Sequence, residues 1–279
     1  MRCARAIVAA IPAALLACAS VAPTPNKTEQ QAVELNQRAG RAFEQGDVRR
    51  AGALYEQALR LNTGVEHTEG IAANALSLAR AHQAAGDTAA AHRVLDELLA
   101  ERPLPIPQAR RAEAQARKAQ LHLDANDTAR ALEWSDKALA SCTGCAALPA
   151  ILNLRGRTAL AAGDRAGALD WADKARAAAA AGSQHAGERA NALRLAGEAR
   201  LARGDHQAAV APLEQALEID RGLGAPARIH LDLMTLGRAH LELGNRVAAR
   251  DYFARARSVS EAVNDQAGVR AASRAIEGL

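Results

Sequence analysis

Apolar and polar positions follow a helical period through residues 190–220, and the stretch divides into two amphipathic helices on either side of Gly204-Asp205. The apolar face of the first helix consists of Leu193, Ala196, Gly197 and Leu201, and that of the second consists of Ala209, Leu213, Ala216 and Leu217. A helical hairpin of this size cannot bury both of its faces by itself. The pattern therefore predicts that similar hairpins pack on either side of this one.

The same turn recurs along the chain at nearly constant intervals. Each copy of the turn is Gly or Asn followed by Asp or Asn, and successive copies stand 40, 40, 37, 41 and 40 residues apart. The six copies begin at Gly46, Gly86, Asn126, Gly163, Gly204 and Gly244. Glycine and asparagine tolerate the left-handed conformation that ends a helix, and the Asp or Asn that follows can cap the next helix. We therefore predict six helical hairpins.

Small residues occupy two fixed places in each copy, where the two helices of a hairpin approach closely. The residues five positions after the start of each turn are Ala51, Ala91, Ala131, Ala168, Ala209 and Ala249. Those seven positions before it are Ala39, Ala79, Ala119, Gly156, Gly197 and Gly237. This registered spacing predicts an all-α solenoid formed by one continuous array rather than two separate domains.

This pattern resembles the tetratricopeptide repeat (TPR), which has a small residue at position 8, Gly-Asp near positions 15 and 16, and alanine at positions 20 and 27. Position 27 is occupied here by Ala58, Leu98, Ala138, Ala175, Ala216 and Ala256, so only Leu98 departs from alanine. The spacing exceeds the usual repeat of about 34 residues, which predicts longer helices. The resemblance implies a TPR-like superhelix of six repeats over residues 29–265 and a capping helix over 266–279. Short polar connections are expected between repeats, for example at residues 62–64 and 102–107.

The first residues have the layout of a secretory signal peptide, with Arg2 and Arg5 followed by an uncharged stretch that is too short to span a membrane. Residues 15–18, Leu-Leu-Ala-Cys, resemble a bacterial lipobox. This resemblance implies a signal peptide over 1–17, lipidation at Cys18, a tether over 18–28 and an outer-membrane lipoprotein that faces the periplasm. The alternative is ordinary cleavage after Ala19 of an A-x-A site, which would leave a soluble secreted or periplasmic protein.

Composition argues against binding to nucleic acid. The 35 basic and 31 acidic residues leave a net charge of +2 if Arg2 and Arg5 are removed with the signal peptide, and no basic tail or stripe is present. Only 2% of residues are aromatic. Trp134, Trp171 and Tyr252 all occupy position 23 of the repeat, which lies on the second helix and therefore outside the groove. Phe43 is then the single aromatic candidate for a groove, whereas single-stranded nucleic acid requires several stacked aromatic side chains.

The sequence contains no motif of a known catalytic or metal site. Three of the eight histidines, His82, His122 and His240, share position 11 of a first helix, which is a packing position in the resembled family. No H-E-x-x-H, G-x-S-x-G or glycine-rich phosphate loop occurs. We therefore expect a protein that is not an enzyme and that has no cofactor and no metal.

Cys142 and Cys145 form a C-x-x-C pair in the one shortened interval between turns. In an oxidising compartment two cysteines at this spacing are expected to form a disulfide that clips the connection between repeats three and four. The alternatives are a reduced inert pair, a redox-active dithiol and a metal site, although no second C-x-x-C is present.

The resemblance implies that first-helix positions 2, 5, 9 and 12 line a concave peptide-binding groove. The polar residues predicted from these positions to bind a peptide are Asn36, Arg80, Asn153, Arg157, Asn191, Arg194, Glu198 and Arg238. Asparagine can hold the backbone of an extended peptide, and arginine forks pair with carboxylates. The alternative is that these arginines form a solvated face paired with neighbouring glutamates.

These features together predict a non-enzymatic scaffold that binds a segment of another cell-envelope protein. Resembling TPR lipoproteins serve in pilus or secretin assembly, in barrel assembly or as adaptors of envelope enzymes. Two alternatives belong to other classes. One is a redox or metal module based on Cys142 and Cys145, and the other is a self-associating structural protein.

Overall fold

The computed structural model describes residues 26–180 and 182–279. The predicted signal peptide, Cys18 and most of the tether lie outside these residues. The described part contains thirteen α-helices and one short 3₁₀ helix, η1 (Ser183–His185). The helices are α1 (Lys27–Glu44), α2 (Val48–Gly64), α3 (Thr68–Ala84), α4 (Thr88–Leu99), α5 (Gln108–Asp124), α6 (Thr128–Ser141), α7 (Leu148–Ala161), α8 (Arg165–Ala178), α9 (Ala186–Arg203), α10 (His206–Gly222), α11 (Pro226–Glu242), α12 (Arg246–Ala262) and α13 (Gln266–Glu277).

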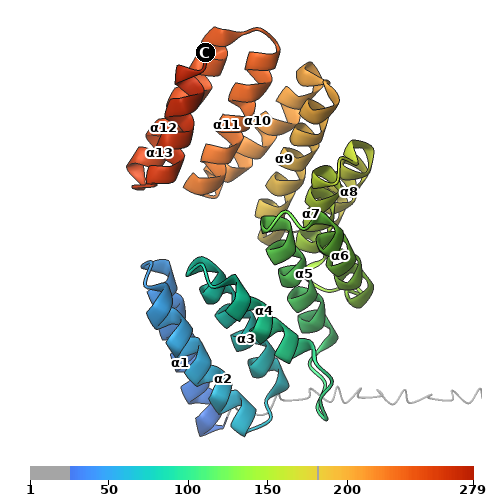
Figure 1. The fold of residues 1–279 in the computed structure, drawn as a ribbon, viewed down its shortest axis with the longest axis vertical. Helices are drawn as coiled ribbons and strands as arrows, with labels where there is room; N and C mark the ends of the chain where they lie inside the picture. Colours follow the sequence, from blue (N-terminus) through green and yellow to red (C-terminus); the bar gives the residue numbers. More distant parts are fainter. Residues whose placement is uncertain (1–25, 181) are drawn as a thin grey trace, which may run out of the picture.

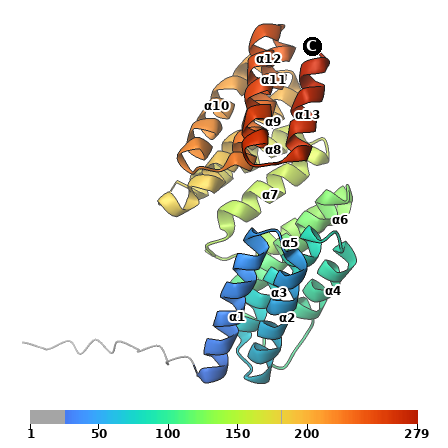
Figure 2. The same cartoon turned by 90° about the vertical axis from the view of Figure 1, so that its left-hand side faces the viewer.

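The helices form six antiparallel hairpins, α1–α2 to α11–α12, which follow one another along the long axis of the molecule with α13 at the far end (Figure 1). Figure 2 shows the N-terminal and C-terminal hairpins at opposite ends. The first helices of successive hairpins also contact one another, from α1 and α3 through to α9 and α11. These first helices therefore form one continuous layer of the solenoid. The predicted all-α fold of six hairpins and a capping helix is confirmed.

The turns within the hairpins adopt the predicted backbone geometry. The first turn residue has a positive φ in every copy, from 58° at Asn126 to 84° at Gly163 and Gly204. In five copies the second turn residue caps the following helix, as where the Asp87 carboxylate accepts from the Ala90 N–H at 2.9 Å. Asp205 is the exception, because its carboxylate pairs with Arg203 instead.

The small residues of the repeat lie where the two helices of each hairpin touch. All six alanines five positions after the turn starts are 0% exposed. Where a glycine replaces alanine on the first helix, the facing side chain fills the space. A Cβ on Gly197 would stand 2.4 Å from Leu213 Cγ, and one on Gly237 would stand 2.4 Å from the Phe253 ring. Close approach of the helices thus compensates for the scarcity of large aromatic side chains.

Two expected boundaries differ from the structure. Helix α1 begins at Lys27, two residues before the predicted start at Glu29, because the Asn26 side chain accepts from the Glu29 N–H and caps the helix there. Residues 62–64 belong to α2 rather than to a connection. The Asn62 amide donates to the Ala58 carbonyl at 3.1 Å, and the Thr63 hydroxyl donates to the Leu59 carbonyl at 2.9 Å. Both polar side chains therefore continue the helix instead of ending it.

Helix α13 covers the end of the array, as the capping-helix prediction requires. Ala272 is 0% exposed and belongs to the apolar cluster formed by α10, α11 and α12. The Asp265 carboxylate caps the helix by accepting from the Ala267 and Gly268 N–H groups. The last hairpin thus has a neighbour that buries its apolar face.

Candidate peptide-binding groove

The first helices α3, α5, α7, α9 and α11 line a groove with a volume of about 730 Å³. Five of the eight predicted groove residues belong to its lining: Asn153, Arg157, Asn191, Arg194 and Glu198. The other three lie outside this lining: Asn36 on α1, Arg80 on α3 and Arg238 on α11. The walls of this groove hold both apolar and charged side chains.

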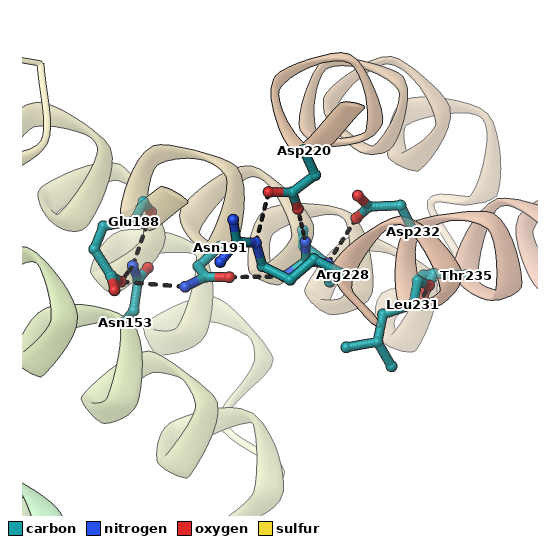
Figure 3. A network of polar contacts seen from close by, with 9 residues as sticks. Asn153, Glu188, Asn191, Asp220, Arg228, Leu231, Asp232 and Thr235 are labelled. Atoms are coloured by element: carbon teal, nitrogen blue, oxygen red, sulfur yellow. Dashed lines mark hydrogen bonds and ion pairs between the residues drawn. The ribbon is translucent and has the colours of Figure 1, made fainter. Parts of the chain in front are cut away.

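Asn153 and Asn191 hold a glutamate at one side of the groove (Figure 3). The Asn153 amide donates to the Glu188 backbone carbonyl at 2.9 Å and to its carboxylate at 2.8 Å, and the Asn191 amide donates to the same carboxylate at 3.2 Å. Asn153 is 4% exposed, and its Oδ1 has no hydrogen-bond partner within the described part of the chain. A buried acceptor without a donor is costly, so this oxygen lowers the stability of the groove wall.

Arg194 has a different role from the one expected for it. It is 8% exposed, and its guanidinium donates from Nε to Asp232 Oδ1 at 2.6 Å and from Nη2 to Asp220 Oδ2 at 2.5 Å. Asp220 also pairs with Arg228 at 2.7 Å (Figure 3). The prediction that Arg194 offers its charge to a ligand is therefore wrong, because two fully buried aspartates from α10 and α11 already occupy the guanidinium.

Asp232 is the residue of this buried network whose negative charge is least well compensated. Burial and the neighbouring Asp220 raise the pKa of Asp232 to about 6, although the Arg194 guanidinium lowers it. The second carboxylate oxygen, Oδ2, has no hydrogen-bond partner among the residues that the structure describes. The network thus fixes α9, α10 and α11 to one another and at the same time carries an incompletely compensated negative charge.

Polar side chains link three first helices near Arg157. The Gln83 amide of α3 donates to Asp124 Oδ2 at 2.7 Å, and the Gln120 amide of α5 donates to Asp124 Oδ1 at 2.5 Å. Gln120 in turn accepts from Arg157 Nη1 of α7 at 3.0 Å. Arg157 is exposed and forms no ion pair within the described residues, so its remaining donors are available to a ligand.

Glu198 lies in the groove beyond Arg157. Burial raises the pKa of the Glu198 carboxyl, and the positive charges of Arg238, Arg194 and Arg157 oppose this shift. Arg238 itself is exposed and donates to the Thr235 hydroxyl at 3.2 Å. The charges of these arginines act on Glu198, although no ion pair joins Glu198 to any of them within the described residues.

The remaining two predicted residues lie towards the N-terminal end. The Arg80 guanidinium stacks over the Phe43 ring at 4.2 Å from its centroid. Phe43, the aromatic residue predicted to line the groove, therefore forms a cation–π contact with Arg80. Asn36 is partly exposed on α1. The structure does not bring Asn36 into the groove lining.

Cys142 and Cys145 form a disulfide in the connection between α6 and α7, with their Cα atoms 5.2 Å apart. Cys142 is 6% exposed and lies in an apolar cluster with Ala112, Ala138 and Ile151. Such surroundings disfavour a thiolate, which is the species that a redox-active dithiol requires. Since Ile151 also lines the groove, the disulfide holds the start of α7 where the groove wall is built.

Two of the three shared-register histidines, His122 and His240, pack against neighbouring rings. The His122 ring lies 4.8 Å from that of His92, and the His240 ring stacks at 5.2 Å on Tyr252. Within residues 26–180 and 182–279 no group of three or more His, Cys, Asp or Glu side chains is arranged to hold a metal ion. A search of the same residues finds no helix that is long and apolar enough to cross a membrane.

Sequence reasoning did not identify five charged residues of this site: Glu188, Asp220, Arg228, Asp232 and Arg117. Two of them contact a residue roughly one repeat away in sequence: Asp232 pairs with Arg194, 38 residues earlier, and Glu188 accepts from Asn153, 35 residues earlier. Asp220 and Arg228 instead pair with each other, 8 residues apart. Opposite charges separated by about the repeat length were the available signal, because the solenoid places such positions on adjacent helices. Arg117 forms no pair, so this signal does not extend to it.

Known proteins share the fold at low sequence identity. Residues 76–144 match the model of the tetratricopeptide repeat family. No curated protein matches the sequence. The crystal structure of PilW, a widely conserved type IV pilus biogenesis factor, is 19% identical with a TM-score of 0.61, and the match covers 84% of this chain and 94% of that one.

Two further structures show the same architecture. A Rap protein complexed with Competence and Sporulation Factor is 16% identical with a TM-score of 0.62, over 88% of this chain and 69% of that one. BtubC from P. vanneervenii is 19% identical with a TM-score of 0.58, over 86% and 93%. At these identities the likeness concerns the fold alone. The chain is therefore an all-α solenoid with the fold of tetratricopeptide repeat proteins, and residues 76–144 carry the recognisable repeat sequence of that family.

Proposed function

We propose that this protein is a non-enzymatic scaffold that binds an extended segment of another cell-envelope protein in the groove of its first helices. Tetratricopeptide repeat proteins are in general interaction modules, and the family match indicates no catalytic activity. The observation that carries the proposal is the groove itself. It combines apolar walls with the exposed donors of Arg157, which suit the carbonyl groups and side chains of a peptide.

The similar structures support this reading at the level of their own descriptions. One of them is complexed with Competence and Sporulation Factor, and another, PilW, is a type IV pilus biogenesis factor. The envelope location rests on the signal-peptide and lipobox pattern that ends at Cys18. Mass spectrometry of the mature protein tests it. A lipid-modified N-terminal Cys18 supports the lipoprotein, and an unmodified N-terminus at Ser20 contradicts it.

A photocrosslinking amino acid at position 157 tests the groove. In cells that produce the full chain, we expect this position to capture a discrete partner, because Arg157 is exposed at the groove wall. The matched control is position 250, an exposed arginine on α12 outside the groove lining. Capture at 250 but not at 157 would contradict binding in the groove. Arg194 is unsuitable as a probe site because its replacement would unpair the buried Asp232 and leave the buried Asp220 with Arg228 alone.

A further inference from the structure

Arg117 is a charged groove residue that the fold leaves without a partner. It lies on α5 and lines the groove, and its side chain is only partly exposed. Among the described residues no acceptor forms a hydrogen bond or ion pair with its guanidinium. Burial and the like charge of Arg80 both lower the pKa of Arg117, and Asp124 opposes them. Partial burial of this cation therefore costs free energy, and no ion pair within the described residues compensates for that cost.

The neighbouring charges do not supply the missing partner. Asp124 is the nearest opposing charge, but both of its oxygens already accept from Gln83 and Gln120. The carboxylate of Glu113, one turn before Arg117 on α5, pairs with Arg110. Glu113 therefore belongs to another ion pair, and Arg117 is left facing the groove.

The charge around Arg117 matches a single carboxylate. Arg117 and Arg157 contribute two positive charges to this wall without an ion pair among the described residues, and Glu198 contributes one negative charge beside them. The remaining single positive charge suits a carboxylate better than a phosphate group, which carries close to two negative charges at neutral pH. Arginine also presents paired N–H donors in the geometry of a carboxylate.

Apolar side chains surround this position in the groove. Leu76 of α3, Ala116 of α5, and Ile151 and Leu154 of α7 belong to the same lining as Arg117. Contact with these side chains removes water from the space beside the guanidinium, which strengthens an ion pair formed there. A ligand that fits this wall therefore carries one acidic side chain with apolar side chains next to it.

We propose that Arg117 determines which segments this scaffold accepts, by pairing with the side-chain carboxylate of an Asp or Glu whose apolar neighbours contact Leu76 and Ala116. This inference rests on the proposed function, because it specifies the chemistry of the segment that the groove binds. The segment belongs to a partner protein and reaches the groove in extended form. Its acidic residue replaces the missing partner of Arg117.

Selection of a displayed library of random dodecapeptides on the full chain tests the proposal. The binders that crosslink to position 157 should be enriched in one Asp or Glu flanked by apolar residues. Arg117→Gln should weaken their binding about 10-fold, as expected for the loss of a charge-assisted hydrogen bond, and Arg250→Gln should leave it unchanged. Arg117→Lys should fall between the two, since it keeps the charge but loses the fork. Arg117→Gln should leave the melting temperature equal to or above that of the wild type.

A charge exchange gives the strictest test. Arg117→Glu should lose the selected acidic peptide and gain the same peptide with Lys at the acidic position. Binders located in the groove that show no acidic enrichment, or that bind Arg117→Gln as tightly as the wild type, would overturn this inference and leave the proposed function standing. Tighter binding of a phosphoserine version would overturn the assignment to a carboxylate. Recovery of no binders, or of binders that crosslink only outside the groove, would overturn both.

Discussion

At the scale of single residues, Arg194 shows how a side chain at a ligand-binding position can instead hold the fold together. Its guanidinium joins Asp220 of α10 to Asp232 of α11 at distances of 2.5 and 2.6 Å, and all three side chains are at least nine-tenths buried. A buried ion pair adds little net stability over an apolar replacement, but removal of one partner is costly because the other charge stays buried. The network therefore makes the junction of repeats five and six sensitive to Arg194.

Arg194→Met should lower the free energy of unfolding by about 3–5 kcal/mol, since Asp232 would lose the one cationic partner that it has among the described residues. Urea unfolding followed by circular dichroism measures this change. Arg203→Met is the matched control. Arg203 pairs with Asp205 at 3.2 Å in a half-exposed position, and its loss should cost about 0–1 kcal/mol. Equal small effects of both variants would show that the buried network contributes no more than a surface pair.

The raised pKa of Asp232 has a consequence for the pH dependence of stability. The folded state holds the proton of this carboxyl more tightly than the unfolded chain, because the pKa is about 6 in the fold and 3.8 ordinarily. The charged carboxylate thus destabilises the fold fully above pH 6, and the penalty is relieved as the pH falls from 6 towards 4.

Asp232→Asn should remove this dependence, because asparagine keeps the shape of the side chain and does not titrate. The difference in the free energy of unfolding between wild type and variant should change by up to about 3 kcal/mol between pH 4 and pH 7, in favour of the wild type at low pH. Denaturant titrations at several pH values measure it. Parallel stability profiles for the two proteins would show that Asp232 has an ordinary pKa in the fold.

The residues of the site were only partly predictable from sequence. Asn153, Arg157, Asn191 and Glu198 follow from the register of the repeat, since the register fixes which face of a first helix they occupy. The register does not reveal partners. An arginine on that face is neutralised only if neighbouring helices supply carboxylates, as α10 and α11 do for Arg194.

At the scale of the helices, the hairpins depend on close contact at positions that carry no side chain. A Cβ on Gly237 of α11 would lie 2.4, 2.6 and 2.9 Å from three ring atoms of Phe253 on α12. Contacts below 3.0 Å force the ring or the helix to move, and Phe253 is itself buried in a tightly packed interior. Glycine is required here by the neighbour rather than by the backbone conformation.

Gly237→Ala should therefore lower the free energy of unfolding by about 1–3 kcal/mol. The control is Gly222→Ala on α10, where a Cβ would meet no atom within 4 Å and the helix should gain about 0.5–1 kcal/mol from the better helix former. Thermal unfolding of both variants distinguishes them by the sign of the change. A stabilising Gly237→Ala would indicate that α11 and α12 have room to separate.

The helical elements were more predictable than the site because their signals are local. A glycine or Asn126 with positive φ, followed by a capping Asp or Asn, determines the end of one helix and the start of the next within a few residues. The prediction failed at residues 62–64, which look like a polar connection but form the last turn of α2. There Asn62 is 3% exposed, and its Oδ1 lies 3.1 Å from His67 Nδ1, so tertiary burial overrides the local preference.

At the scale of the whole molecule, the array behaves as a row of units that contact mainly their neighbours. Helix α13 packs on α12, and its Ala272 belongs to the apolar cluster of α10 to α12. The apolar cluster around α1, α2 and α3 shares no residue with it. In such a solenoid the stability of each hairpin depends on its own contacts and on the interface with the next one.

Deletion of residues 266–279 should consequently destabilise the C-terminal end first. We expect amide hydrogen exchange to accelerate about 10-fold or more in α11 and α12, because the deletion exposes the apolar face that Ala272 covers. Exchange in α1 to α4 should stay within about two-fold of the wild type. The matched control is Ala275→Ser, a partly exposed change on α13 that leaves the cap in place. Uniform acceleration across all six hairpins would mean that the array unfolds as one cooperative unit, and α13 would then stabilise the whole molecule instead of its last repeat.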